Sequence, residues 1–367
     1  MTPNYLSDFT LYGRLVLAGR IIEDGAVSVE NGIIKYSGGA AGAPAIGEVI
    51  RTDNIIAPGF VDIHCHAGGE YYAYEDPQYV ANYHLSHGTT GMLLTFYRDL
   101  GHENTVRYIN SVKKIMLAGS NVLGVHLEGP YLNPSYGAAA GYETPVCPEK
   151  YRELAATGVV RQWTFAPEVD GTAEFLRYIV SLGIVPAIGH SAASPEQVYA
   201  ANAGGARIVT HLYDATGTSV SPTRWGGTIE TSFCSAALLC DDMYYEIICD
   251  SAGIHVRPDM VRLTAKTVGC GRIIGITDAC TGSIDDSDVN FVGCDLMGSK
   301  LTMDAVARNF LALGFSIPEV FAITSENPAT AIRMSDKVGS LREGRRGDVL
   351  IVDDKLNLVR IIKSGAN

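Results

Sequence analysis

The sequence of 367 residues contains no apolar run that approaches the length of a membrane span. Its first eleven residues lack the basic start, apolar stretch and small-residue cleavage site of a secretory signal. No fixed-period repeat and no low-complexity tract is visible. With 47% hydrophobic residues, however, the chain can bury a large core. These features predict a soluble, globular protein of the cytoplasm that does not associate with membranes.

Basic residues are in the minority. The chain has 28 Lys and Arg and 40 Asp and Glu, which gives a formal net charge of −12. An acidic surface repels nucleic acid and anionic lipid, so neither is an expected partner. The remaining expectation is a small-molecule substrate.

Paired cysteine motifs are also missing. The eight cysteines include no C-x-x-C pair, and several lie inside apolar runs, as Cys249 does after Ile247 and Ile248. This distribution is typical of reduced, buried thiols in a cytoplasmic protein.

Both ends of the chain consist of short β-type runs broken by glycine. These runs cover residues 13–17, 25–29 and 32–37 near one end, and 348–352 and 358–362 near the other. Their alternation and turns are typical of a small antiparallel sheet. We therefore predict one small β-sandwich domain that is built from residues 1–56 and 337–367.

The middle of the chain alternates apolar runs with helix-compatible stretches. Alternation of this kind indicates parallel βα units, and eight units over residues 57–336 fit an α/β fold of the (β/α)8 TIM-barrel type, typically about 250 residues long. The predicted strands are 59–66, 90–96, 122–128, 162–167, 184–190, 207–213, 244–250 and 272–278. The predicted helices include 102–118, 171–182, 195–203, 257–269 and 317–334, the last broken before Pro328.

Polar side chains stand at the ends of several predicted strands, where such barrels carry their functional residues. The first strand ends in His64 and His66, which share one face because strand side chains alternate. Taken alone, this pair fits hydrogen-bonded core histidines as well as a metal site. Convergence with residues from four other strand ends predicts a divalent metal site, with candidate ligands His64, His66, Glu128, His190 and His211 and a sixth polar residue, Asp278.

Nitrogen and oxygen donors of this kind suit Zn²⁺ or another first-row divalent ion. Such an ion lowers the pKa of bound water towards about 7 and polarises a carbonyl oxygen, as hydrolysis of an amide or ester requires. Asp278 is then either a further ligand or the base that passes a proton from water to the departing amine. His126 lies one layer deeper than Glu128, so we expect it to hydrogen-bond near the ligands and not to bind the metal.

Five motifs follow one another along the chain: Pro58-Gly59-Phe60-Val61-Asp62-x-His64-x-His66, His126-Leu127-Glu128-Gly129-Pro130, Gly189-His190-Ser191, His211-Leu212-Tyr213 and Thr277-Asp278-Ala279. In this order they resemble the amidohydrolase superfamily, and within it the family of N-acetylglucosamine-6-phosphate deacetylases. The resemblance covers nearly the whole chain. Related hydantoinases and dihydroorotases bridge their metals with a modified lysine on the fourth strand. This chain differs from them, because its predicted fourth strand, residues 162–167, contains no lysine.

The resemblance implies a metal-dependent hydrolase that removes the acetyl group from an amino sugar, N-acetylglucosamine 6-phosphate. It implies a homodimer and one or two divalent ions, with Zn as the first expectation and Fe, Mn or Co as alternatives. It assigns acid/base catalysis to Asp278. It also implies that Glu128, His190 and His211 bind the principal metal and that His64 and His66 bind a second metal.

The resemblance also implies substrate contacts for His255, Arg224, Asp214 and Ala215, although a solvated loop charge is an equal alternative for Arg224. Ala139 stands where the family has a histidine that contacts the substrate carbonyl. Asp214 stands where the family has a neutral amide near the sugar phosphate. A carboxylate beside a phosphate is unfavourable by about 1 kcal/mol if solvated and by several if the site is dry.

Two other functions remain open. The first keeps the barrel and the metal but acts on a non-phosphorylated N-acyl sugar, an N-acyl amino acid or a cyclic amide, which Asp214 and Ala139 favour. The second is a catalytically silent protein that binds a metal or a sugar on the same scaffold. The presence of Asp278 beside five candidate ligands argues against the second, because binding alone needs no base.

Overall fold

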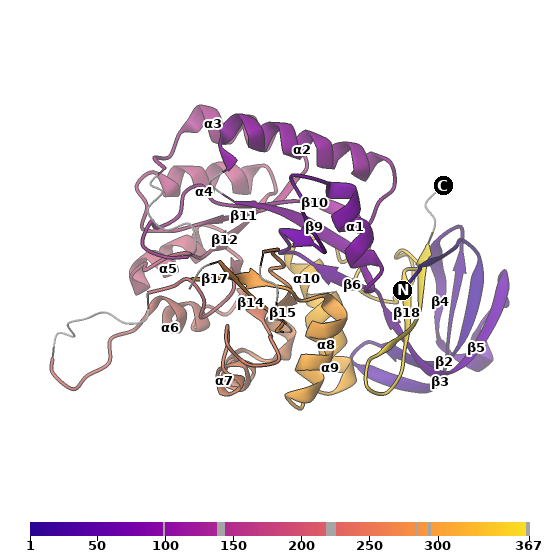
Figure 1. Ribbon diagram of the computed structural model, residues 1–367. Helices are drawn as coiled ribbons and strands as arrows, with labels where there is room; N and C mark the ends of the chain where they lie inside the picture. The colour runs from indigo at the N-terminus through magenta and orange to yellow at the C-terminus, as the bar shows by residue number, and fades with distance from the viewer. Residues whose placement is uncertain are drawn as a thin grey trace.

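The computed structural model describes residues 1–97, 100–137, 144–217, 225–282, 285, 287–292 and 295–364 (Figure 1). It contains an eight-stranded parallel sheet that carries helices on its outside and a seven-stranded sheet beside it. Among these residues, no helix has both the length and the apolar character that crossing a membrane requires.

The parallel sheet has the strand order β6-β9-β10-β11-β12-β13-β14-β15, so each strand pairs with its successor along the chain. All eight predicted strand positions hold one of these strands, and the predicted barrel is confirmed. Their inward and outward side chains are almost all buried, as is typical of parallel strands covered by helices. The strands are Phe60–Asp62 (β6), Thr89–Tyr97 (β9), Val122–Glu128 (β10), Val160–Phe165 (β11), Val185–Ile188 (β12), Ile208–Val209 (β13), Tyr244–Ile248 (β14) and Ile273–Ile276 (β15).

The barrel closes between the segments that follow β6 and β15. The Asp278 amide donates to the His64 carbonyl oxygen at 2.9 Å, and Cys65 forms a parallel bridge with Ala279. One residue before Asp278, the Thr277 hydroxyl donates to the buried carboxylate of Asp62, the last residue of β6, at 2.5 Å. This seam therefore joins the loop of the two strand-end histidines to the loop of Asp278.

Ten α-helices are assigned within the described residues, and the helices predicted at five places are present. The range 317–334 is broken by a π-helical turn, Ala322–Glu326, immediately before the helix that contains Pro328. Local sequence signals explain several helix starts. In the helix Pro195–Ala203, for example, the preceding Ser194 forms a capping box with Gln197, and Pro195 is the first helical residue. The helices are Pro77–Leu85 (α1), His102–Leu117 (α2), Pro148–Ala156 (α3), Thr172–Ser181 (α4), Pro195–Ala203 (α5), Phe233–Leu238 (α6), Pro258–Val268 (α7), Met303–Ala312 (α8), Ile317–Phe321 (α9) and Asn327–Ala331 (α10).

The second sheet is built from both ends of the chain, as predicted, in the order β1-β19-β18-β5-β2-β3-β4. It is a mixed sheet and not the antiparallel one expected, because β2 pairs parallel with β5 and β1 pairs parallel with β19. Its own apolar cluster includes Phe9, Val27 and Ile56. The exact domain boundaries remain a proposal. The strands are Asn4–Leu6 (β1), Phe9–Leu17 (β2), Arg20–Glu30 (β3), Ile33–Gly39 (β4), Glu48–Pro58 (β5), Val349–Val352 (β18) and Leu358–Ser364 (β19).

Two short antiparallel pairs lie in the loops at the carboxyl ends of the barrel strands. One joins Ala67–Gly68 (β7) to Tyr71–Tyr72 (β8), and the other joins Val289–Val292 (β16) to Asp295–Ser299 (β17). Neither pair was predicted from the sequence. The second pair holds the loop after β15, because the Ser299 amide donates to the Asp278 carbonyl oxygen at 2.8 Å.

Candidate active site

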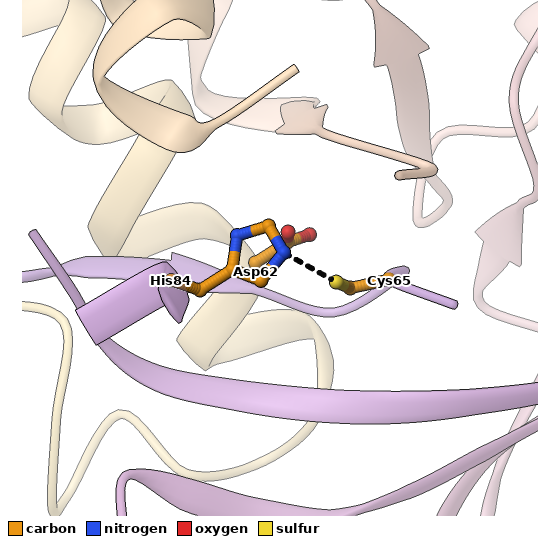
Figure 2. A group of neighbouring side chains, drawn as sticks. All are labelled: Asp62, Cys65 and His84. Atoms are coloured by element: carbon orange, nitrogen blue, oxygen red, sulfur yellow. Dashed lines mark hydrogen bonds between the residues drawn. The ribbon is translucent and has the colours of Figure 1, made fainter. Parts of the chain in front are cut away.

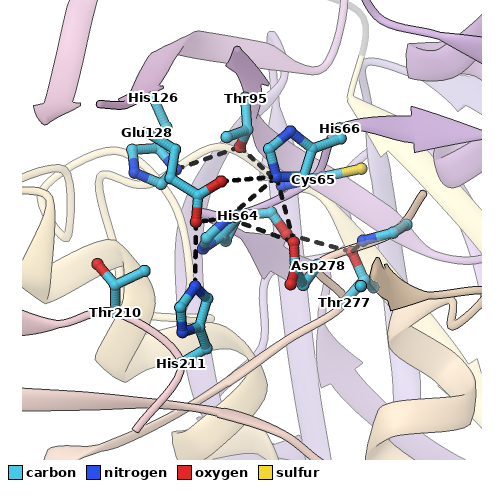
Figure 3. Close-up of polar contacts among 12 residues, drawn as sticks. His64, Cys65, His66, Thr95, His126, Glu128, Thr210, His211, Thr277 and Asp278 are labelled. Atoms are coloured by element: carbon cyan, nitrogen blue, oxygen red, sulfur yellow. Dashed lines mark hydrogen bonds and ion pairs between the residues drawn. The ribbon is translucent and has the colours of Figure 1, made fainter. Parts of the chain in front are cut away.

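Glu128, the last residue of β10, lies among the imidazoles of His64, His66 and His211 (Figure 3), and the imidazole of His190 also contacts it. Its Oε1 atom is 2.9 Å from His190 Nε2 and 3.0 Å from His211 Nε2. His64 Nε2 lies 3.3 Å from the same oxygen, and His66 Nε2 lies 3.2 Å from Oε2. The structure therefore brings together all five candidate ligands, which the chain carries on four separate loops or strand ends.

Asp278 reaches the same group from the loop after β15. Its Oδ1 atom is 3.2 Å from His66 Nε2 and 3.4 Å from His64 Nε2. Burial alone would raise the pKa of Asp278, but the two imidazoles outweigh it and lower the pKa below its usual range. The carboxylate is thus ionised at neutral pH.

Three residues of the site have backbone angles that L-residues rarely adopt. The φ angles are +47° at His190, +26° at His211 and +45° at Asp278, all in the left-handed region. The surrounding backbone holds two of them, because the Asn133 amide donates to the His190 carbonyl at 3.0 Å and Ser299 binds Asp278 as described. Such conformations concentrate at functional sites, where the fold fixes side-chain direction at some cost in stability.

Glu246 of β14 orients His64 from the interior of the barrel. Its Oε2 atom lies 3.1 Å from His64 Nδ1, while Oε1 accepts a hydrogen bond from Gln162 Nε2 at 2.7 Å. Because a carboxylate can only accept, Nδ1 of His64 carries a proton, and Nε2 is the nitrogen turned towards Glu128 and Asp278. Sequence reasoning missed this residue, although a glutamate inside the apolar run 244–250 was a usable signal.

The donors fit a divalent cation. His190 Nδ1 lies 3.2 Å from the Tyr136 carbonyl oxygen, which places a proton on Nδ1 and makes Nε2 the nitrogen that would bind an ion. Nε2 of His190 and Nε2 of His211 are only 3.0 Å apart and both face one carboxylate oxygen. Two groups of ligand atoms share Glu128, one with His190 and His211 and one with His64 and His66. Imidazole nitrogens and carboxylate oxygens are a donor set typical of zinc and similar ions.

His126 does not face these ligand atoms with a free nitrogen. Its Nε2 atom lies 2.8 Å from the Thr164 hydroxyl and its Nδ1 atom 3.2 Å from the Thr95 hydroxyl. Burial lowers the pKa of His126 well below its usual value, so the ring is neutral. It packs edge-on against His64, at 4.5 Å between ring centroids, and so supports a ligand without being one.

On the expected substrate side, Asp214 and His255 form a close ion pair. The Asp214 Oδ2 atom lies 2.6 Å from His255 Nδ1, and His255 Nε2 lies 3.0 Å from the Gly298 carbonyl oxygen. Both ring nitrogens face acceptors, so both carry protons. Burial opposes this charge, but the hydrogen bond to Asp214 prevails and raises the pKa of His255. The Ala215 amide donates to Asp214 Oδ1 at 2.8 Å, whereas Arg224 and Ala139 lie outside the described residues.

Asp62, Cys65 and His84 form a separate, fully buried cluster between the end of β6 and helix α1 (Figure 2). His84 Nε2 lies 2.8 Å from the Ala67 carbonyl oxygen and 3.2 Å from the Cys65 sulfur. Burial lowers the pKa of His84 to about 4, so the ring is neutral. Hydrogen bonds within the protein engage the Asp62 carboxylate, the Cys65 thiol and His84 Nε2, whereas His84 Nδ1 has no hydrogen-bond partner among the described residues.

Comparisons with known proteins match this arrangement. Residues 55–366 match the amidohydrolase family model. The N-acetylglucosamine-6-phosphate deacetylase of Bacillus subtilis (strain 168) is 28% identical, over 96% of this chain and 94% of its own. The N-acetylgalactosamine-6-phosphate deacetylase of Escherichia coli O157:H7 is 26% identical, over 95% and 96%. A mutant N-acetyl-D-glucosamine-6-phosphate deacetylase from Mycobacterium smegmatis, solved in complex with N-acetyl-D-glucosamine-6-phosphate, superposes with a TM-score of 0.83 at 25% identity, over 98% of both chains.

Proposed function

Because the chain belongs to the amidohydrolase family, we propose that it is a metal-dependent amide hydrolase that removes the acetyl group from N-acetylglucosamine 6-phosphate. One observation carries the proposal: the ligand atoms of Glu128, His190 and His211 lie 2.9–3.0 Å apart, with the ionised Asp278 beside them. The relatives named above supply the amino-sugar substrate class.

Glu128, His190 and His211 would hold the principal ion, and His64 and His66 a second one. A divalent ion held there would lower the pKa of water and polarise the acyl carbonyl oxygen of the substrate. Zn²⁺ is the ion we expect first, with Fe, Mn and Co as alternatives. Metal analysis of the purified protein measures both the identity of the ion and the number per chain.

Asp278 would move the proton. Its carboxylate accepts the proton of the attacking water and returns it to the nitrogen of the leaving amine, because an amide anion is a poor leaving group. Glu246 holds His64 in the tautomer that leaves Nε2 facing the reaction side. Ala139 supplies no group to the substrate carbonyl, since its side chain is a methyl group.

The test is amine release by metal-replete protein from N-acetylglucosamine with and without the 6-phosphate and from N-acetylgalactosamine 6-phosphate. We expect kcat/KM to be highest for N-acetylglucosamine 6-phosphate. Equal or faster release without the phosphate would instead establish the second candidate, a hydrolase of non-phosphorylated N-acyl compounds. Bound metal without amine release from any N-acyl sugar, N-acyl amino acid or cyclic amide would indicate a silent binding protein.

The second candidate is favoured by the carboxylate of Asp214, which His255 neutralises and holds in place. If Asp214 lies near the substrate phosphate, Asp214→Asn removes a repulsion of about 1 kcal/mol. The ratio of kcat/KM for phosphorylated over plain N-acetylglucosamine should then rise about fivefold. Asp242→Asn, at an exposed carboxylate that binds Arg207, is the control and should leave the ratio unchanged. An unchanged ratio in the Asp214 variant would show that Asp214 does not lie near the substrate phosphate.

We also propose a cytoplasmic homodimer, with His255, Arg224 and Ala215 among its substrate contacts. Seven free cysteines within the described residues support a reducing compartment. Light scattering during size exclusion measures the number of subunits.

A further inference from the structure

Tyr97, the last residue of β9, bounds the proposed active site directly beside one of its candidate ligands. In the parallel sheet it pairs with Glu128, the last residue of β10. Paired residues of neighbouring strands project to the same face of a sheet, and the pair one layer deeper, Thr95 and His126, is in hydrogen-bond contact. Tyr97 therefore lies in the layer of Glu128, at the carboxyl rim of the barrel. Its ring lies against that of His66, at 4.8 Å between centroids and 46° between planes.

Other tyrosines hold the ring of Tyr97 in place. Tyr72 and Tyr74 pack against it edge-on, at 6.1 and 6.4 Å between centroids and with interplanar angles of 86° and 79°. These two rings stack on each other at 5.2 Å, and Tyr74 also contacts Tyr108 of helix α2 at 5.5 Å. Aromatic pairs at such distances are in close contact, so the ring of Tyr97 cannot move away from His66 without displacing its neighbours. Tyr72, Tyr74 and Tyr97 form the tyrosine wall of the site.

The backbone ties this wall to the loops that carry the candidate ligands. The Tyr72 hydroxyl donates to the Thr281 carbonyl oxygen at 2.8 Å, in the loop that follows Asp278. The Ala73 amide donates to the His66 carbonyl oxygen at 2.8 Å. The side chains of Tyr72 and Tyr97 share a further hydrogen bond. The wall is thus a rigid part of the site, as a surface that selects between similar groups requires.

The tyrosine wall stands across the barrel from the proposed contacts of the sugar. Asp214 lies in the loop after β13 and His255 in the loop after β14, the sixth and seventh strands of the barrel, whereas Tyr97 ends the second. In a closed ring of eight strands, the second and the sixth stand opposite each other. Glu128 contacts imidazoles that follow the first, fifth and sixth strands, so the candidate ligands lie between the two sides.

The shape of an amide group converts this placement into a role for the wall. A secondary amide is planar and predominantly trans, so its acyl chain and its nitrogen substituent point away from each other. If the sugar lies beside Asp214 and His255 and the carbonyl group lies at the candidate ligands, the acyl chain is directed at Tyr97.

We propose that Tyr97, backed by Tyr72 and Tyr74, forms the acyl subsite and limits the acyl group to the length of acetyl. The acetyl methyl group packs on the Tyr97 ring, whereas a longer chain has to displace a ring that its neighbours hold in place. This proposal rests on the proposed function, because it takes the amino sugar as the other half of the substrate.

The experiment measures kcat/KM of the metal-replete protein for N-acetyl-, N-propionyl- and N-butyrylglucosamine 6-phosphate, and for the same series without the phosphate. We expect the wild type to prefer acetyl over propionyl by about 10–200-fold, the usual effect of one methylene group at a fitted site. This comparison needs no variant. Equal kcat/KM for the three chain lengths, or a preference for butyryl, would overturn the proposal.

Three variants test which part of the wall sets the limit. Tyr97→Ala removes the ring, so the preference for acetyl over butyryl should fall about tenfold or more. Tyr97→Phe keeps the ring and should keep the wild-type preference, which separates the ring from the hydroxyl group. Tyr71→Ala is the matched control, because this exposed tyrosine packs on Tyr79 and belongs to no part of the wall. An unchanged preference in folded Tyr97→Ala would contradict the role of the ring.

Binding measurements separate acyl recognition from turnover. Calorimetry on Asp278→Asn, in which hydrolysis should be slow, gives the Kd of each compound. The N-butyryl compound should bind about tenfold or more weakly than the N-acetyl compound, and Tyr97→Ala added to this variant should remove the difference. Equal affinities in Asp278→Asn would contradict the wall.

Failure of this proposal differs from failure of the proposed function. Hydrolysis of N-acetyl and N-butyryl compounds at equal rates would keep the proposed function and overturn the acyl limit. Neither binding nor hydrolysis of any N-acyl amino sugar would contradict both.

Discussion

The imidazoles of the site differ in which ring nitrogen is already engaged, and this difference determines what each can do. His64 and His190 use Nδ1 for Glu246 and for the Tyr136 carbonyl, so each presents Nε2 to Glu128. His126 uses both nitrogens for threonine hydroxyls and presents neither. Hydrogen-bond partners therefore separate the candidate ligands from a neighbouring histidine that is equally buried.

Asp278 is the group whose loss should affect proton transfer most directly. Asp278→Asn keeps the shape of the side chain but removes its basicity, so we expect kcat to fall by about 10²–10⁴-fold. Metal content should stay at the wild-type level, because Glu128 and its histidines remain. Steady-state kinetics and metal analysis of the same preparation measure both quantities. A fully active variant would contradict the assigned role.

Loss of a ligand should instead appear in the metal content. His211→Ala removes the nitrogen that lies 3.0 Å from both Glu128 and His190, so affinity for the principal ion should fall about a hundredfold or more. Dialysis against a competing chelator followed by metal analysis gives the affinity. His102→Ala, on helix α2 and paired with Glu153, is the matched control and should bind metal like the wild type. Full occupancy in His211→Ala would show that the ligand assignment is wrong.

Strands β6 and β15 lie at the two ends of the parallel sheet and do not pair with each other. Closure of the barrel therefore depends on contacts at and after the carboxyl ends of these two strands. Asp62 and Thr277 supply one of these contacts, and backbone bonds at His64 and Asp278 supply another. The same seam therefore closes the barrel and sets the separation between the proton acceptor and the strand-end histidines.

Replacing Thr277 by Val should weaken this seam. The change keeps the side-chain volume but removes the donor to a fully buried carboxylate, which costs about 1–3 kcal/mol of unfolding free energy. Chemical denaturation measures the loss. Thr267→Val, at an exposed position of helix α7, should cost no more than about 0.5 kcal/mol. Equal stability of the two variants would show that the Asp62 contact does not stabilise the barrel.

Across the molecule, the barrel and the second sheet meet at Asp348. Its carbonyl oxygen accepts from the Gly59 amide at 3.2 Å, immediately before β6. Its buried carboxylate binds Lys363 Nζ at 2.9 Å, the Ser364 amide at 3.0 Å and Arg346 at 3.1 Å. Asp348 thus links the start of the barrel, through its backbone carbonyl, to the last strand of the chain, through its carboxylate.

Asp348→Asn should destabilise the whole fold by about 3–5 kcal/mol at pH 7, because it leaves Lys363 buried without its counter-charge. Burial alone would raise the pKa of Asp348, but Lys363 and Arg346 prevail and lower it. A carboxylate with a lowered folded pKa stabilises the fold above its unfolded value of about 4, and this contribution is lost as pH falls through the folded pKa.

The stability difference between wild type and Asp348→Asn should therefore be constant near neutral pH and shrink as the pH falls below about 4. Denaturation midpoints measured across this range give the difference directly. Asp336→Asn, at an exposed position, should show no such difference. A difference that is independent of pH down to acid unfolding would mean that the ion pair is not its cause.

The sequence by itself determined the parts that depend on local pattern. Apolar runs bounded by polar residues identified all eight barrel strands, because strand and helix periodicities are properties of neighbouring residues. Since the carboxyl ends of barrel strands meet at one rim, it also indicated that Glu128, His190 and His211 would lie together. A terminal β sheet from both chain ends followed from the same kind of pattern.

Only the tertiary structure decided which distant residues touch. His64 and Glu246 are 182 positions apart, and Asp62 and Thr277 are 215 apart, yet each pair is in hydrogen-bond contact. No local signal specifies such partners, because they depend on how the barrel closes and in which register its strands lie. For the same reason the parallel pairing of β2 with β5 and the placement of Tyr97 against His66 became visible only once the whole chain was folded.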